Sequence, residues 1–149
     1  MPKTPNARPP AQNPAPMALQ AQFGQGVALH QQGKLADAER IYVEVLRQQP
    51  NHFDALYLLG VIAVQARRAE RGVELITKAI ALKPDHADAY NNRGVALQDL
   101  KRPEEALASY DKAIALKPDF AEACTVYMAA VVNTSLTLRP SARCCAKRR

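Results

Sequence analysis

The same residue types recur every 34 positions through most of this 149-residue chain. The octapeptide KAIALKPD occupies residues 78–85 and, letter for letter, residues 112–119. Two kinds of residue keep the same spacing over three copies: Gly26, Gly60 and Gly94, and Pro50, Pro84 and Pro118. A fixed period of this length is typical of a protein that stacks copies of one small structural unit.

Each period has room for two helices of three to four turns. In the third period the apolar spacing predicts helices over about residues 87–100 and 103–116. Pro103 suits the first position of its helix, where the missing N–H would have no partner. The proline that ends each period follows a helix and stops it. Gly33 is expected to supply the turn between the two helices of the first period.

Small residues are expected where the two helices of a period face each other. Gly94 and Ala106 would let their backbones approach closely, and Tyr90 and Tyr110 would fill the space beside them. One helix pair cannot bury its apolar face alone, whereas three stacked pairs bury a continuous core. The sequence therefore predicts an all-α solenoid of antiparallel helix pairs.

The first helix of each pair is expected to start just after a proline. Asn51, Asp85 and Asp119 follow these prolines and are the predicted N-caps. The residues three positions further on come close to a reciprocal capping box: Asp54, Asp88 and Glu122. His52 and His86 also lie one period apart, and repetition explains them better than a metal or catalytic role does.

The net charge of +6 belongs to the ends of the chain. Residues 1–16 and 139–149 carry seven Lys or Arg and no acid, whereas residues 17–138 carry 13 Lys or Arg and 14 Asp or Glu. A short charge run of this kind is usually a solvated end, so a nucleic-acid partner is not expected. Arg67, Arg68 and Arg71 are likewise interpreted as a solvated turn between helices.

No motif for catalysis or cofactor binding is found. Neither glycine-rich phosphate loop occurs, and the three cysteines, Cys124, Cys144 and Cys145, lack the spacing of metal ligands. We therefore expect no enzyme activity, no cofactor, no metal and no small-molecule substrate. The proline-rich start has no apolar signal core, and no apolar run is long enough to span a bilayer. A cytoplasmic protein without membrane contact is the default expectation.

The third period resembles a known repeat family. Its pattern is Tyr90-x-x-Arg93-Gly94-x-x-Leu97, then Ala106-x-x-x-Tyr110, Ala113 and Pro118, which is similar to the tetratricopeptide repeat. The resemblance implies a right-handed superhelical solenoid that acts as a protein–protein interaction scaffold. The second period departs from the pattern at Gly72, where alanine is usual, and the first period is atypical at Gln22 and Gln25.

The resemblance also predicts the domain organisation. A proline-rich arm, residues 1–16, precedes a repeat domain over residues 17–133, and a basic tail without repeats covers 134–149. The predicted repeats are 19–52, 53–86 and 87–120, with a partial fourth at 121–133. The fourth repeat fails after Cys124. Two hypotheses fit this failure: a basic tail with its own partner, or a reading frame that shifts near this point in a longer repeat protein.

In this family a concave groove, lined by the first helix of successive repeats, holds a protein or peptide partner. Carried over by position, the groove residues are Phe23, Val27, His30, Asp54, Tyr57, Val61, Asp88, Asn91, Asn92, Val95 and Gln98. The carboxylate clamp of chaperone-binding members needs Lys, Arg and Asn along the groove. Here the equivalent Lys and Arg are missing, and the nearby candidates are Arg93, Asn91 and Asn92. An acidic carboxy-terminal peptide is therefore not the expected partner.

A second functional hypothesis rests on the phrase AYNNRGVAL, residues 89–97. It is similar to the repeats that precede the catalytic region in bacterial relatives of O-linked N-acetylglucosamine transferase. Those relatives place Asn at the sixth position of each repeat to hold a peptide backbone. Here Asn92 occupies that position, whereas Leu58 and Gly24 stand at the equivalent positions. The alternative is therefore a truncated or frameshifted N-terminal repeat segment of such a glycosyltransferase.

Overall fold

The computed structural model describes residues 16–118, 125 and 129. Between residues 16 and 118 it contains six α-helices: α1 (Pro16–Gln31), α2 (Leu35–Gln48), α3 (Phe53–Gln65), α4 (Ala69–Leu82), α5 (Ala87–Asp99) and α6 (Pro103–Leu116). The two helices predicted for the third period are confirmed, with the first ending one residue earlier than expected. The N-cap at Asp119, the cysteines, the basic tail and, apart from residues 125 and 129, the partial fourth repeat lie outside the described residues.

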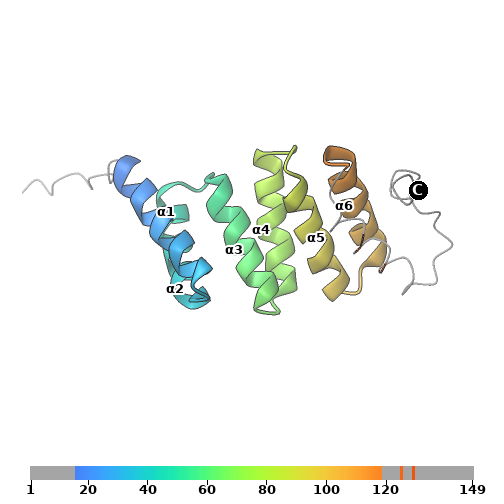
Figure 1. Ribbon diagram of the computed structural model, residues 1–149, viewed down its shortest axis with the longest axis horizontal. Coiled ribbons are helices and arrows are strands. Elements are labelled where there is room, and N and C mark those ends of the chain that lie inside the picture. The colour runs from blue at the N-terminus through green and yellow to red at the C-terminus, as the bar shows by residue number, and fades with distance from the viewer. Residues whose placement is uncertain (1–15, 119–124, 126–128, 130–149) are drawn as a thin grey trace, which may run out of the picture.

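The helices form a single row of antiparallel pairs (Figure 1). We call α1, α3 and α5 the A helices, and α2, α4 and α6 the B helices. Every helix packs against its neighbour in sequence, and α3 also contacts α5 directly. The contact between α3 and α5 places these two A helices in one layer, and the expected all-α solenoid of helix pairs is confirmed. Among the helices that the structure describes, none combines the length and apolar character needed to cross a bilayer.

The repeated glycines lie where each A helix approaches its B helix most closely. A Cβ atom on Gly26 would lie 2.7 Å from Tyr42 Cε1, and one on Gly60 would lie 2.6 Å from Ile76 Cγ1. A Cβ atom on Gly94 would overlap the ring of Tyr110. Any side chain at these positions would push the paired helices apart, which explains the 34-residue spacing of glycine.

Gly72 is the departure from the usual alanine, and its neighbour explains it. A Cβ atom on Gly72 would lie 2.5 Å from Val64 Cγ2 and 3.3 Å from the carbonyl oxygen of Gly60. A valine in a helix has one strongly preferred side-chain rotamer, so Val64 has little freedom to move aside. The branched side chain of Val64 thus fills the space that an alanine at position 72 would need.

The predicted N-caps were wrong by one residue. The N-caps of α3 and α5 are His52 and His86, in place of Asn51 and Asp85. The Nδ1 atom of each imidazole accepts a hydrogen bond, 3.2 Å long, from the backbone N–H three residues later. Imidazole Nδ1 is two bonds from Cβ, as is the side-chain oxygen of Asp or Asn, so it reaches the same orphan N–H.

This shift also changes the role of Asp54 and Asp88. With His52 and His86 as caps, the two aspartates belong to the first turns of α3 and α5. They therefore do not occupy the last position of a capping box. A carboxylate in the first turn still interacts favourably with the positive end of the helix dipole.

Each A helix ends in the same left-handed turn. The second residue after the helix has a positive φ in all three units: 75° at Gly33, 60° at Arg67 and 56° at Lys101. In each turn a backbone N–H returns to a carbonyl five residues earlier, as from Arg68 to Ala63 at 2.8 Å, which is the Schellman pattern. The turn predicted at Gly33 is confirmed, and the two other units place long side chains in a conformation that favours glycine.

Lys101→Gly is expected to raise the free energy of unfolding by up to about 1 kcal/mol, because it removes the steric cost of a lysine in the left-handed backbone conformation. Gly33→Ala is the reciprocal change and should lower stability by about 1 kcal/mol. Urea unfolding of the full chain, followed by circular dichroism, measures both. Destabilisation by Lys101→Gly would contradict this account of the turns.

Candidate functional site

The predicted groove residues all lie on the A helices. Phe23, Val27 and His30 are on α1, Asp54, Tyr57 and Val61 on α3, and Asp88, Asn91, Asn92, Val95 and Gln98 on α5. Most of these side chains are partly exposed, Asp54 is exposed, and Asn91 is buried. The direct contact between α3 and α5 brings the residues of these two helices together.

Tyr57 is the centre of a polar cluster between α3 and α5. Its hydroxyl oxygen accepts a hydrogen bond of 2.8 Å from Nδ2 of Asn92. Burial raises the pKa of Tyr57, the nearby charge of Asp88 raises it further, and the hydrogen bond from Asn92 acts in the opposite direction. We call these three residues, Tyr57, Asp88 and Asn92, the polar cluster.

The aromatic groove residues Phe23 and Tyr57, which lie one period apart, also pack on the next unit. The ring of Phe23 lies 4.8 Å from that of His52, and the ring of Tyr57 lies 5.1 Å from that of His86, measured between centroids. Each histidine thus caps one A helix and contacts an aromatic ring of the A helix before it. The sequence assigned Phe23 and Tyr57 only to the groove. Their identical spacing from the two histidines was the signal for this second role.

Gln98 also has a structural partner. Its Oε1 accepts a hydrogen bond of 2.5 Å from the hydroxyl of Tyr110, so the side chain is oriented toward α6. In the first unit the equivalent positions hold His30 and Tyr42, whose ring centroids are 6.3 Å apart. The repeat position that His30 and Gln98 share therefore contributes to the contact between the A and B helices of one unit.

The two equivalent tyrosines differ in their hydrogen bonds. The hydroxyl of Tyr42 is buried and has no hydrogen-bond partner among the described residues, whereas that of Tyr110 is hydrogen-bonded to Gln98. Burial raises the pKa of Tyr42 to about 12. Burial, with a smaller contribution from the charge of Asp99, also raises the pKa of Tyr110. Both phenols therefore stay protonated well above neutral pH.

Arg93 does not contribute to the groove. Its Nε atom donates to Oγ of Ser109 on α6 at 3.0 Å, and its guanidinium carbon lies 5.3 Å from the centroid of the Tyr90 ring. The guanidinium is therefore directed toward α6. The groove positions named above hold two carboxylates, Asp54 and Asp88, and no Lys or Arg.

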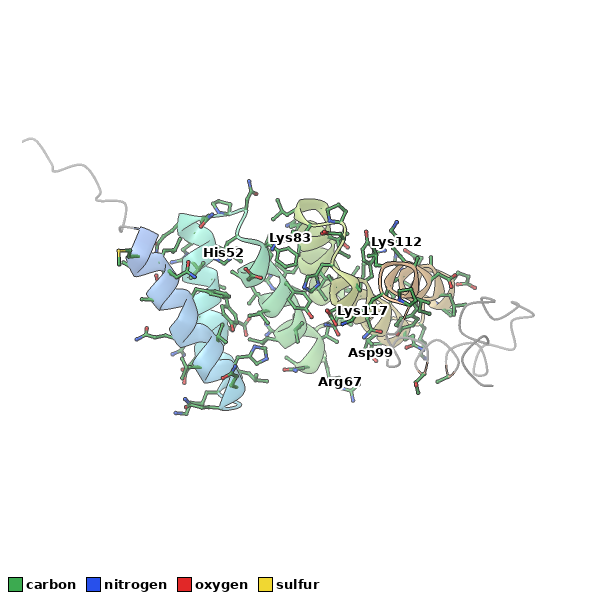
Figure 2. The ribbon with its side chains drawn as sticks, turned by 45° about the horizontal axis from the view of Figure 1, so that its top comes forward. His52, Arg67, Lys83, Asp99, Lys112 and Lys117 are labelled. Carbon is green, nitrogen blue, oxygen red and sulfur yellow. The ribbon has the colours of Figure 1, made fainter. Side chains whose placement is uncertain are left out.

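The arginine cluster at the turn before α4 is already paired in part. Arg68 binds both carboxylate oxygens of Glu39, at 2.9 and 2.7 Å, and this interaction holds the pKa of Glu39 below its usual value. Arg67 lies 3.9 Å from the carboxylate of Asp99. Both residues lie at one edge of the molecule, and His52 and Lys83 lie at the opposite edge (Figure 2). Within the described part of the chain, no group of three His, Cys, Asp or Glu residues could hold a metal ion.

Comparison with known proteins identifies the family. One tetratricopeptide repeat model matches residues 29–93 and another matches residues 87–120. The chain belongs to the tetratricopeptide repeat family. No curated protein matches the chain.

Solved structures of the same fold come from proteins of different kinds. MamA from Desulfovibrio magneticus superposes with a TM-score of 0.76 at 23% identity, over 78% of this chain and 66% of that one. The first TPR domain of Spaghetti (RPAP3), bound to the HSP90 peptide SRMEEVD, gives 0.76 at 20% identity, over 79% and 94%. A mutant O-GlcNAc transferase from Thermobaculum terrenum gives 0.77 at 26% identity, over 85% and 24%. The chain thus spans about two thirds of MamA and about a quarter of the transferase.

Proposed function

We propose that this protein is an interaction scaffold that binds an extended peptide segment along its A helices. The observation that carries the proposal is the polar cluster of Tyr57, Asp88 and Asn92, which lies between α3 and α5 and is only partly buried. Val61 and Val95 are partly exposed on the same two helices. Such a surface offers apolar contact with a few polar groups for orientation, as ligand sites commonly do.

The hydrogen bond between Asn92 and Tyr57 leaves complementary groups for a peptide backbone. Nδ2 of Asn92 is the donor, so Oδ1 of the same amide remains an acceptor. The hydroxyl of Tyr57 accepts from Asn92 and keeps its own proton to donate. One donor and one acceptor side by side match the C=O and N–H of a peptide chain, whatever its side chains are.

The charge of the groove indicates which peptides are preferred. Asp54 and Asp88 are the charged residues among the groove positions, and both lie in the first turn of an A helix. A segment that combines Lys or Arg with apolar side chains would complement them, whereas an acidic segment would be repelled. The solved relative with the acidic HSP90 peptide therefore supports the shared fold and the use of a peptide, but not the same peptide chemistry.

Peptide display on the full chain tests this function. We expect the enriched peptides to contain Lys or Arg together with apolar residues. The double variant Asp54→Asn/Asp88→Asn should weaken an enriched peptide by about tenfold at low salt, since each exposed charge pair contributes up to about 1 kcal/mol. Asp111→Asn, an exposed carboxylate on α6, is the matched control and should leave the affinity unchanged. Enrichment of acidic peptides would contradict the proposal.

A second candidate is the peptide-recognition segment of a longer glycosyltransferase. The observation that favours it is the structural match to the Thermobaculum terrenum O-GlcNAc transferase, of which this chain spans 24%. Under this hypothesis the groove would present a peptide to a catalytic domain elsewhere. Turnover of a UDP-sugar by this chain alone would contradict the non-enzymatic scaffold. If no repeat or transferase sequence resumes downstream in any reading frame of the gene, the second candidate fails.

A further inference from the structure

A cavity of about 420 Å³ lies between the B helices α4 and α6, away from the groove. Val73 and Thr77 of α4 form one wall, and Ala108 of α6 contributes to the other. Arg93 and Leu97 of α5 also line the cavity, together with Arg102, Glu105 and Ser109 at the start and middle of α6. A volume of this size is within the range of small-ligand sites, so the chemistry of its lining decides what it could hold.

The charge in this cavity is a departure from the repeat. Arg93 and Ser109 stand at the positions that Leu59 and Leu75 occupy one unit earlier. Those two leucines are buried core residues, with exposed fractions of 2% and 7%. The third unit thus replaces an apolar pair between its A and B helices with a guanidinium and a hydroxyl. Packing alone gives no reason for this exchange, because two leucines fill the equivalent space in the second unit.

The guanidinium of Arg93 is held in one orientation. Nε donates to Oγ of Ser109 at 3.0 Å, and that hydroxyl, which is fully buried, donates to the carbonyl oxygen of Glu105 at 2.9 Å. The guanidinium carbon lies over the ring of Tyr90, 5.3 Å from its centroid. A guanidinium has five N–H donors, and this arrangement uses the one on Nε. The four donors on the terminal nitrogens make no hydrogen bond to the described part of the chain.

The acidic side chain of the cavity does not neutralise Arg93. Glu105 is bound through both carboxylate oxygens by Arg102, at 2.6 and 2.7 Å. The lining therefore contains two guanidinium groups and one carboxylate, and the carboxylate is paired with Arg102. A positive charge remains at Arg93, in a cavity whose lining also includes Thr77 and the apolar side chains of the walls.

We propose that this cavity binds a carboxylate carried on a short aliphatic stem, with Arg93 as its bidentate partner. The planar fork of a guanidinium matches the two oxygens of a carboxylate, and its orientation here is preset by Ser109. The hydroxyl of Thr77 can donate to the same group, and Val73 and Leu97 can pack on the stem. An acidic side chain of a partner protein and a free dicarboxylate share this chemistry.

Titration of the isotope-labelled full chain with glutarate tests the site by following the Nε–H resonance of Arg93 and, in every variant, the backbone amide resonances of the lining residues Val73, Thr77 and Leu97. We expect a saturable shift of this resonance, with an affinity on the order of 1 mM. The double variant Arg93→Leu/Ser109→Leu copies the Leu59–Leu75 pair, so it should fold at least as stably and show no binding elsewhere in the cavity. Arg93→Lys keeps the charge without the fork and should bind about tenfold more weakly.

Further arms of the titration distinguish the sources and the alternatives. Tighter binding of a short peptide with an internal glutamate than of glutarate would identify a partner protein as the source, and the reverse would identify a free dicarboxylate. Asp54→Asn/Asp88→Asn should leave the titration unchanged, which separates this site from the groove. Inorganic phosphate binding as tightly as glutarate would overturn the assignment, as would an unshifted Arg93 resonance at about 50 mM glutarate.

Discussion

Gly60→Val is expected to lower the free energy of unfolding by about 3 kcal/mol or more. A Cβ atom on Gly60 would meet Ile76 Cγ1 at 2.6 Å, the backbone nitrogen of Ile76 at 3.3 Å and the carbonyl oxygen of Gly72 at 3.4 Å. Two of these neighbours belong to the backbone of α4, so a change of side-chain rotamer cannot relieve the overlap. The two helices of the second unit would have to separate, and thermal or urea unfolding measures the loss.

Gly24→Val is the matched control for this experiment. Gly24 lies on α1, and a Cβ atom there would meet no heavy atom within 4 Å. The same substitution is expected to change stability by no more than about 0.5 kcal/mol, since the helix propensities of glycine and valine differ by about that amount. Equal effects of the two substitutions would show that close helix packing is not the reason for glycine at position 60.

Tyr110→Ala is expected to destabilise the protein by about 3–5 kcal/mol, the usual cost of removing a buried aromatic ring. The ring of Tyr110 is fully buried and lies against Gly94 on α5. The same core cluster contains the fully buried Ala106 and Ala113, whose side chains are too short to fill the space that the ring leaves. For a small domain this loss is a large part of the total stability, so the variant should unfold at a much lower urea concentration.

A pair of milder substitutions isolates the hydroxyl group. Tyr110→Phe removes the hydrogen bond to Gln98 and should cost about 1 kcal/mol. Tyr42→Phe removes a buried hydroxyl that has no hydrogen-bond partner, so it should be neutral or stabilising. The two tyrosines occupy equivalent repeat positions, and the comparison therefore controls for ring burial. Equal costs would contradict the difference between their partners.

The fold could be predicted from the sequence because its signals are local and repeated. The helices of the third unit were placed within one residue from apolar spacing and proline positions. The predicted close approach of the two helices at Gly94 is confirmed, because a Cβ atom there would overlap the ring of Tyr110. The predicted turn at Gly33 is confirmed by its positive φ. Asn51 and Asp85 failed as N-caps because a histidine one position later can provide the same acceptor, and residue type alone does not choose between them.

The candidate site was less accessible to such reasoning. The positions on the A helices were carried over from the family, and their role in binding a partner stays a prediction. What the positions could not reveal is that Tyr57 is hydrogen-bonded to Asn92 and that Gln98 is hydrogen-bonded to Tyr110. Each of these contacts joins residues from different helices. Their distances depend on how two helices are rotated about their axes, which no spacing along one helix specifies.

The sequence by itself determined the repeat, the helix pairs and the family, because a period of 34 residues repeats the same local preferences three times and leaves one way to bury the apolar faces. Only the tertiary structure decided the direction of individual side chains. Arg93 appears in the sequence beside the groove residues, yet it is directed away from them toward Ser109 and the cavity between α4 and α6. The physical reason is that the Arg93 guanidinium is held by the hydroxyl of Ser109 and lies over the ring of Tyr90. The position of Ser109 relative to Arg93 depends on how α6 packs against α5.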